Sequence, residues 1–305
     1  MTTQPVAQAT ITEKPKRVWT LPQIILVFVI FLFVLTCVLP FVNVIAISLS
    51  SKSAILRGEV RFWPVEFTTQ AYELLFKDSS MTRSLLFTVE VTVIHTVIAL
   101  VLTVLMSYPL TKKRLRGRKF FSFFALFTMY FSGGIIPTYL NIQELGLMNT
   151  SWSLILPAAL STYYMIIMKS FFSALPEELE EAAIIDGAND FQVLWKVYLP
   201  LSMASLATIT LFYAVNKWNS FQDAKYYITS RDLQPLQLKL YNIIKGSQAV
   251  EVATVEGSGA NTLSQSVSES IESATIIFAT LPILVVYPFV QRYFVAGVTI
   301  GAVKG

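Results

Sequence analysis

The residues of this sequence that could do acid–base chemistry in an apolar setting are Glu90 and His95. Both lie between residues 84 and 111, where Glu90 is the only Asp, Glu, Lys or Arg. An ionisable residue in an apolar segment indicates a function by default. Helical positions five apart, however, are separated by about 140°, so the two side chains do not share a face as a proton-relay pair would. We expect a structural role for both, and lining of a pathway is the second interpretation.

Metal, nucleotide and nucleophile chemistry are excluded by residue counts and motifs. Cys37 is the single cysteine and His95 the single histidine, which excludes a disulfide framework, a Cys-based metal site and a multi-histidine site. The pattern G-x-x-x-x-G-K-[ST] is absent, so the sequence has no P-loop for ATP. A nucleophile–base constellation typical of a membrane-embedded enzyme is also missing. We therefore expect no catalytic residue, no metal and no cofactor bound by this chain.

Amide and aromatic side chains gather in the stretch FYAVNKWNSFQDAKYY, which follows an apolar segment. Amides hydrogen-bond to hydroxyl groups, and aromatic faces suit the C–H face of a sugar ring. The pattern predicts contacts with a sugar, whereas the alternative is a Trp/Tyr belt at the membrane interface. The substrate-pathway candidates are Asn216, Trp218, Asn219 and Gln222, with Tyr163, Tyr164 and Asn43 from other apolar segments.

The amino-acid composition indicates what kind of structural element positions these residues. Of 305 residues only 14% are charged and 54% are hydrophobic, and the mean hydropathy is +0.59. Soluble domains carry about 25% charged residues, so this chain could not cover a water-facing surface. A soluble enzyme and a disordered chain are excluded. We attribute the net charge of +4 to membrane orientation rather than to nucleic-acid binding.

Long stretches of the sequence carry few or no charged residues. Each is about as long as, or slightly shorter than, the roughly 20 apolar residues that a membrane-spanning helix needs. The sequence predicts an all-α polytopic membrane protein. Its transmembrane domain covers 21–294 and has six spans, at about 22–49, 85–110, 119–140, 151–171, 200–221 and 272–291.

Orientation follows from the loop TKKRLRGRK, which holds six basic residues within 112–119 and no acid. Such a loop lies on the cytoplasmic side. We expect the run to act only as a topological anchor. With six spans, the tails 1–20 and 295–305 are then cytoplasmic, as is 173–200. The segment 224–270 lies outside, as an extended polar linker or as a docking surface for another protein.

The cytoplasmic segment SALPEELEEAAIIDGANDFQVLWKVYLPL predicts two short helices. Ser173 can cap the first, which begins with acidic residues, and Gly187 suits its left-handed end. Asn189 or Asp190 can cap the second, Phe191–Tyr198, which we expect Pro200 to terminate. The product is a stiff element presented to the cytoplasm.

The surface of this element favours protein docking. Ala182 and Ala183 form a small-residue patch that allows close approach, and Glu181 can meet a basic partner. The alternative is an amphipathic hairpin lying on lipid headgroups, but such helices are basic, whereas this one is acidic.

Four motifs carry a resemblance to a known family. Glu181-Ala182-Ala183, Gly187, Val197 and Leu199-Pro200 have the spacing of the EAA loop and resemble ABC-importer permeases. With Asp186, the stretch Glu181–Ala188 resembles the carbohydrate-uptake branch that includes the maltose permease subunits. The ending QRYFVAGVTIGAVKG is similar to the tail of the maltose inner-membrane subunit. GGIIPTYL (Gly133–Leu140) and the pair Trp218-Asn219 resemble members that serve oligosaccharides from complex polysaccharides.

The resemblance implies a type I ABC importer fold in the bacterial cytoplasmic membrane. The chain would be the permease subunit of an ATP-driven importer of a sugar, in particular an oligosaccharide. Its implied partners are a second homologous permease, two cytosolic ATPase subunits that bind ATP and Mg, and an extracytoplasmic solute-binding protein. Either this subunit or the second permease would contact the sugar.

Site residues also follow from the resemblance. It places the ATPase-coupling loop at 173–200, with Glu181, Ala182, Ala183, Asp186, Gly187, Leu199 and Pro200. The tail residues Gly301, Ala302, Val303, Lys304 and Gly305 would reach the ATPase subunits. The alternative function is an ion-coupled secondary carrier of a small polar solute. Such carriers show internal repeats and paired intramembrane acids, which are not evident here.

Overall fold

The computed structural model describes residues 20–255 and 269–288, with the side chains of 20–246 and 269–288. These residues form helices and connecting loops without a strand, as the sequence predicts. The helices are α1 (Leu21–Ser48), α2 (Lys52–Leu56), α3 (Gln70–Lys77), α4 (Ser79–Ser107), α5 (Arg118–Tyr130), α6 (Ile135–Glu144), α7 (Trp152–Ile155), α8 (Thr162–Ser173), α9 (Glu177–Ile185), α10 (Asp190–Val193), α11 (Leu199–Leu201), α12 (Met203–Asn219), α13 (Gln222–Tyr227), α14 (Leu236–Val255) and the helix Glu269–Pro288.

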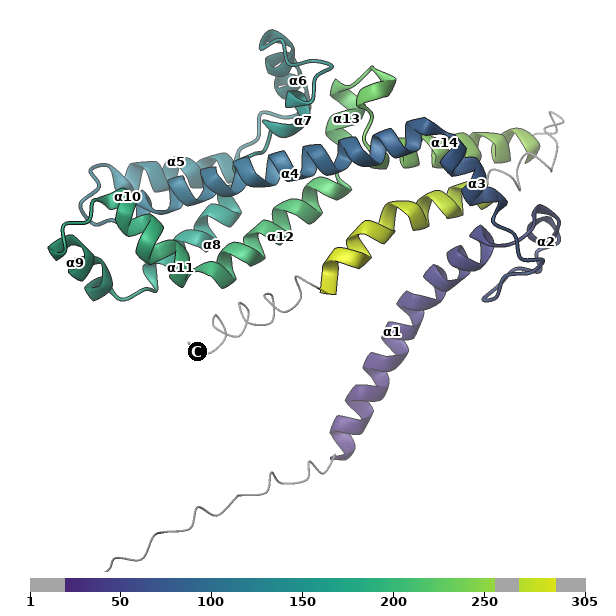
Figure 1. Cartoon of the computed structure of the whole chain (residues 1–305), viewed down its shortest axis with the longest axis horizontal. Helices are drawn as coiled ribbons and strands as arrows, with labels where there is room; N and C mark the ends of the chain where they lie inside the picture. Colours follow the sequence, from purple (N-terminus) through teal and green to yellow (C-terminus); the bar gives the residue numbers. More distant parts are fainter. Residues whose placement is uncertain (1–19, 256–268, 289–305) are drawn as a thin grey trace, which may run out of the picture.

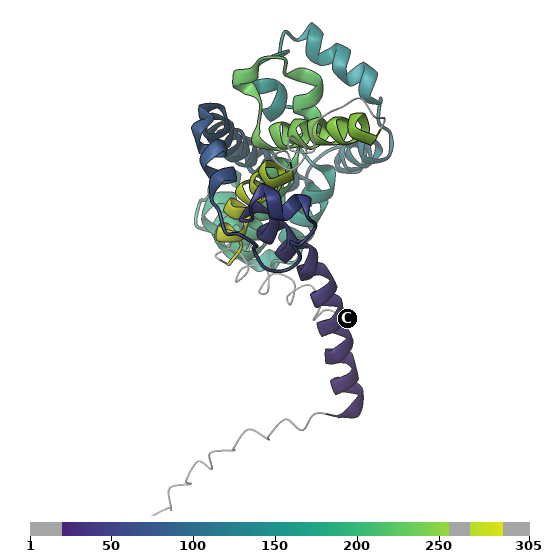
Figure 2. The same cartoon turned by 90° about the vertical axis from the view of Figure 1, so that its right-hand side faces the viewer.

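The central element is α4, along which α8, α12 and α14 pack (Figure 1). At one end of the bundle lie α9 and α10, and at the other lie α2 and α3. Helix α1 extends away from this bundle in both views (Figures 1 and 2). Its most apolar part makes no buried contact with the rest of the described chain.

A stripe of small and hydroxyl residues explains why helices approach α4 closely. Spaced three or four apart, its members face inward: Ser84, Thr88, Thr92, Thr96, Ala99, Thr103 and Ser107 are all buried. Small residues let membrane helices come close without a hydrophobic driving force. Thr103 and the Tyr213 hydroxyl share a 2.7 Å hydrogen bond that joins α4 to α12, and the Ser161 backbone N–H donates to Tyr213 at 3.0 Å.

Three described helices are long and apolar enough to cross a membrane, and up to five spans result if each bent pair counts as one. The three are Leu21–Ser48, Ser79–Thr111 and Glu269–Pro288. The bent pairs are α5 with α6, at 112°, and Asp190–Leu201 with α12, at 84°. The count of six spans stays a prediction.

Two predicted spans are not single straight helices. The span at 119–140 breaks at Gly134, whose φ of +85° lies in the region that favours glycine. The span predicted at 151–171 is not one continuous helix either. It is interrupted after α7, where Pro157 lacks the N–H that a helix interior requires and Ala158 has a φ of +57°. The remaining 12 residues of α8 extend only about 18 Å, short of the roughly 30 Å hydrocarbon core.

The segment 224–270 is not an extended linker in its described part. Residues 236–255 form α14, and Leu236 and Leu238 are buried against neighbouring helices. The first helical turn of α14 has backbone N–H groups that need acceptors. Thr88 on α4 supplies one, because its hydroxyl accepts from the Leu236 N–H at 2.8 Å.

This contact predicts that Thr88 fixes the start of α14. Thr88→Val keeps the shape but leaves the buried Leu236 N–H without its acceptor, at a cost of about 1–3 kcal/mol. Hydrogen–deuterium exchange should show faster exchange in α14, while the control Thr88→Ser should match the wild type. Unchanged exchange in Thr88→Val would contradict this role.

Candidate coupling segment and polar cavity

The acidic two-helix segment, residues 173–200, begins differently from the prediction. Ser173 is the last residue of α8 rather than the cap of α9, because the Ala174 N–H still bonds back to the Phe171 carbonyl. Helix α9 starts at Glu177 after Pro176. Its first turn carries acidic side chains, which the positive end of the helix dipole favours, as predicted.

The turn between the two helices is confirmed in detail. Gly187 has a φ of +84°, its N–H donates to the Ile184 carbonyl at 3.0 Å, and the Ala188 N–H donates to the Ala183 carbonyl at 2.9 Å. These two bonds form a Schellman closure. Asn189 then caps α10 through reciprocal 2.9 Å bonds with Gln192. A stiff, sharply defined corner results.

The second helix does not end at Pro200. It continues through a π turn, Leu194–Tyr198, into α11 and bends by 84° only at Ser202, before α12. Proline disrupts the i→i−4 bonds of a regular helix, and the π turn directly before Pro200 has a different ladder. The segment is therefore continuous with α12 through one bend.

Large apolar side chains project from this segment into open space. Ile185 is 85% exposed, and Phe191 and Trp195 are each 65% exposed. Glu181, Ala182, Asp186 and Pro200 are exposed as well. Of the predicted small-residue patch, Ala182 is exposed but Ala183 packs against the core. Leu199 packs against the core as well. The exposed face is apolar with an acidic residue beside it.

A mostly buried ion pair joins this segment to the basic loop after α4. Lys112 Nζ lies 2.6 Å from Glu180 Oε2, and the Tyr198 hydroxyl donates to the same oxygen at 2.8 Å. The Lys112 and Glu180 side chains are only 8% and 17% exposed. The Lys112 ammonium also lies 4.1 Å from the ring centres of Tyr108 and Tyr198, at cation–π distance.

Burial and pairing act in opposite directions on these groups. Burial by itself raises the pKa of Glu180, but the hydrogen bonds from Lys112 and Tyr198 outweigh it and hold the pKa below its ordinary value. Burial lowers the pKa of Lys112, and Glu180 offsets this only in part. Each charge is therefore retained in this setting because of the other.

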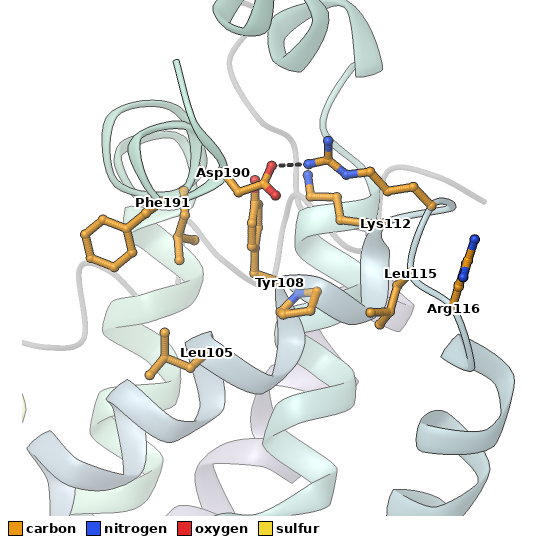
Figure 3. A pocket seen from close by; sticks show the side chains of 10 residues that line it. Leu105, Tyr108, Lys112, Leu115, Arg116, Asp190 and Phe191 are labelled. Atoms are coloured by element: carbon orange, nitrogen blue, oxygen red, sulfur yellow. Dashed lines mark hydrogen bonds and ion pairs between the residues drawn. The ribbon is translucent and has the colours of Figure 1, made fainter. Parts of the chain in front are cut away.

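The expectation that the basic run is only a topological anchor is wrong. Lys113 pairs with Glu177 at 2.6 Å, and Arg114 pairs with Asp190. Figure 3 shows Lys112 and Asp190 above Tyr108, where the loop meets α10. The loop and the acidic two-helix segment thus lie at the same end of the molecule, which agrees with the prediction that they share a side.

A second feature, the polar cavity, has a volume of about 250 Å³ and lies among α4, α8, α12 and α13. Tyr163, Tyr164 and Asn216 all line it, so the structure brings together three of the seven substrate-pathway candidates. Tyr164 also packs edge-on against Tyr213, with ring centres 4.7 Å apart. The lining combines aromatic faces, hydroxyl groups and an amide.

The other four candidates lie elsewhere. Trp218 is buried and donates to the Ala279 carbonyl at 3.3 Å, which fastens α12 to the helix Glu269–Pro288. Asn219 donates to its own helix at Val215. Asn43 donates to the Arg61 carbonyl at 2.6 Å, and Gln222 is exposed at the start of α13.

Glu90 and His95 face different directions, as predicted. His95 is buried, lines the polar cavity and donates from Nδ1 to the Ile155 carbonyl at 2.8 Å, which leaves Nε2 as an acceptor in the neutral ring. Glu90 is exposed. His95 therefore has the expected structural role and also lines the polar cavity, while lining of a transport pathway stays a prediction.

Sequence reasoning missed Lys217, which also lines the cavity. Its side chain is 8% exposed and lies 3.4 Å from Asp223. In the sequence this lysine follows a stretch without charged residues that begins at Val197. The available signal was its position inside the predicted span 200–221. The tail candidates Gly301–Gly305 lie outside the described residues.

The Lys112–Glu180 pair predicts strong coupling between two positions 68 residues apart. Removing one partner of a buried pair costs up to about 3–5 kcal/mol, so Lys112→Met and Glu180→Gln should each lower the free energy of unfolding. Their double mutant should lose about 1–3 kcal/mol less than the sum.

Denaturant titration in mixed micelles measures these free energies. The exposed pair Lys113 and Glu177 is the matched control and should show no measurable coupling. Additive losses at Lys112 and Glu180 would show that the contact stabilises nothing.

Comparison with known proteins places the chain. No protein-family model matches it. It is 42% identical over 275 residues to the polygalacturonan/rhamnogalacturonan transport system permease protein YtcP of Bacillus subtilis, covering 90% of this chain and 95% of that protein. It is 26% identical to an arabinooligosaccharide transport permease of Halalkalibacterium halodurans, covering 88% and 91%.

A solved structure agrees with these relatives. The chain resembles a subunit of a bacterial ABC transporter involved in the import of the acidic polysaccharide alginate. The TM-score is 0.81 and the identity 31%, covering 92% of this chain and all of that one. The chain therefore belongs to the family of sugar ABC-transporter permeases.

Proposed function

We propose that this permease imports an oligosaccharide across the bacterial cytoplasmic membrane and couples to cytosolic ATPase subunits through residues 173–200. The observation that carries the proposal is the exposed apolar face of Ile185, Phe191 and Trp195, presented on a stiff, capped corner. An apolar face of this kind, with an acidic rim at Glu181, is typical of a surface that a partner protein covers.

The segment can pass a displacement into the bundle by two routes. The first is the Lys112–Glu180 contact, which connects α9 to the end of α4. The second is the continuous backbone from α10 through α11 to α12. Closure of two ATPase subunits on ATP and Mg would therefore move α4 and α12, two of the helices that border the polar cavity. The tail Gly301–Gly305 is proposed as a further ATPase contact.

Helix α1 supports pairing with a second permease. Its side chains from Ile24 to Leu35 are exposed and apolar, and it stands apart from the bundle (Figure 2). Lipid or another helical subunit must cover this length. We place the second permease there, with six spans in this chain and both termini in the cytoplasm. An extracytoplasmic binding protein would then deliver the sugar to the opposite end.

The polar cavity supports the sugar assignment. Tyr163, Tyr164 and Asn216 provide the aromatic faces and the amide that suit a sugar ring. The relatives reported above are named for polygalacturonan/rhamnogalacturonan, for arabinooligosaccharides and for the acidic polysaccharide alginate. An ion-coupled carrier is not favoured, because Glu90 and His95 lie on different faces of α4.

The docking assignment predicts that Glu181→Lys and Gly187→Pro abolish sugar-dependent ATP turnover without preventing membrane insertion. The first places a cation where a basic partner residue would meet it, and the second imposes a φ near −65° where the turn needs +84°. ATP hydrolysis by the reconstituted transporter is the measurement. Glu178→Lys, an exposed charge reversal one turn earlier, is the control and should retain activity. Wild-type uptake in Glu181→Lys or Gly187→Pro would contradict docking through this corner.

The assembly itself can be tested directly. An affinity-tagged chain should co-purify with an ATPase and a second permease, and a binding protein loaded with oligosaccharide should raise ATP hydrolysis by that complex. Screening the binding protein against a panel of oligosaccharides identifies the sugar. Purification without any ATPase would overturn the proposed function.

A further inference from the structure

The wall of the polar cavity contains a cation that the proposed coupling mechanism does not use. Lys217 lies near the end of α12, and its side chain is 8% exposed. It lines the cavity together with Tyr164, Asn216 and His95. A lysine so far removed from water needs a counter-ion or hydrogen-bond acceptors.

The counter-ion that the described chain provides is a loose one. Lys217 Nζ lies 3.4 Å from Asp223 Oδ2, whereas a strong charge-assisted bond is about 2.7–2.9 Å long. Asp223 is also far better hydrated, with 36% of its side chain exposed. Lys217 therefore depends on the contact more than Asp223 does. A second carboxylate entering the cavity could replace Asp223, which would return to water at little cost.

The side chains around Lys217 indicate which class of molecule could carry that carboxylate. Asn216 and Tyr164 offer hydrogen-bond donors and acceptors for hydroxyl groups. In the neutral ring of His95, Nε2 can accept a hydrogen bond from one more hydroxyl group. The volume of about 250 Å³ is below the roughly 300–1,000 Å³ typical of sites for drug-sized ligands. It suits a single carboxylated sugar ring rather than a whole chain.

We propose that the polar cavity binds a uronic acid residue of the transported oligosaccharide, whose carboxylate displaces Asp223 and pairs with Lys217. The proposal rests on the proposed function and names its substrate class. Lys217 is then a specificity-determining residue that distinguishes acidic from neutral oligosaccharides.

Binding to the intact transporter tests this. The complex of both permeases and the ATPase, in nanodiscs without binding protein, is dialysed to equilibrium against labelled digalacturonate or its methyl ester. The wild type should bind the acid about tenfold more tightly than the ester. This ratio corresponds to the binding free energy that one charge-assisted hydrogen bond contributes. Lys217→Gln should remove this preference, because it should weaken the binding of digalacturonate and leave the binding of the ester unchanged. Lys217→Arg should keep most of it.

Asp223→Asn gives an effect of opposite sign. Removing the competing carboxylate should tighten binding of digalacturonate severalfold, whereas a merely structural pair would predict weaker or unchanged binding. Lys225→Gln is the matched control, since it removes an exposed cation of α13 that contacts the Tyr241 ring and hydroxyl and does not line the cavity. It should leave both ligands unaffected.

The outcomes separate the two proposals. No preference for the acid in the wild type, no detectable binding, or equal losses for both ligands in Lys217→Gln would overturn the role of Lys217. Stimulation of ATP hydrolysis by neutral oligosaccharides alone would overturn the uronate site while leaving oligosaccharide import intact. Failure to associate with an ATPase would instead remove the proposed function.

Discussion

The fold depends on close approach of helices to α4. A bilayer supplies little hydrophobic force between helices, so association requires surfaces that fit. The buried stripe from Ser84 to Ser107 provides such a surface along the whole helix. Hydroxyl groups in the stripe add specific bonds, to Tyr213 of α12 through Thr103 and to the start of α14 through Thr88. Larger side chains at these positions would separate α4 from the elements that form the cavity and hold the acidic two-helix segment.

The charged contacts at the end of α4 complement this packing. Lys112 and Glu180 have both lost most of their hydration, and their mutual contact with Tyr198 offsets the loss. Such a pair tolerates little relative movement, because separation would leave two buried charges. Exposed pairs such as Lys113 with Glu177 impose no such restriction. The Lys112–Glu180 contact therefore restricts the position of α9 relative to α4, in addition to the packing of Ala183 against the core.

Local features were predictable from sequence, and long-range partnerships were not. The left-handed turn at Gly187 and the cap at Asn189 follow from residue type and spacing alone. Charge gaps locate the apolar helices, but they do not show that Pro157 interrupts one of them. The roles of Lys112 and Lys217 depend on partners that only the folded chain brings near. Trp218 has the chemistry of a sugar contact, yet its indole is used to hold the helix Glu269–Pro288.

Because α4 is long, a small rotation near its Lys112 end produces a larger displacement farther along the helix. His95, in the cavity wall, lies 12 residues from Ser107, or about 18 Å along the axis. A tilt of about 10° around the Ser107 end of α4 would carry His95 sideways by about 3 Å, roughly the length of a hydrogen bond. A small rotation at the Gly187 corner would thus be enough to make or break a polar contact between His95 and a ligand in the cavity.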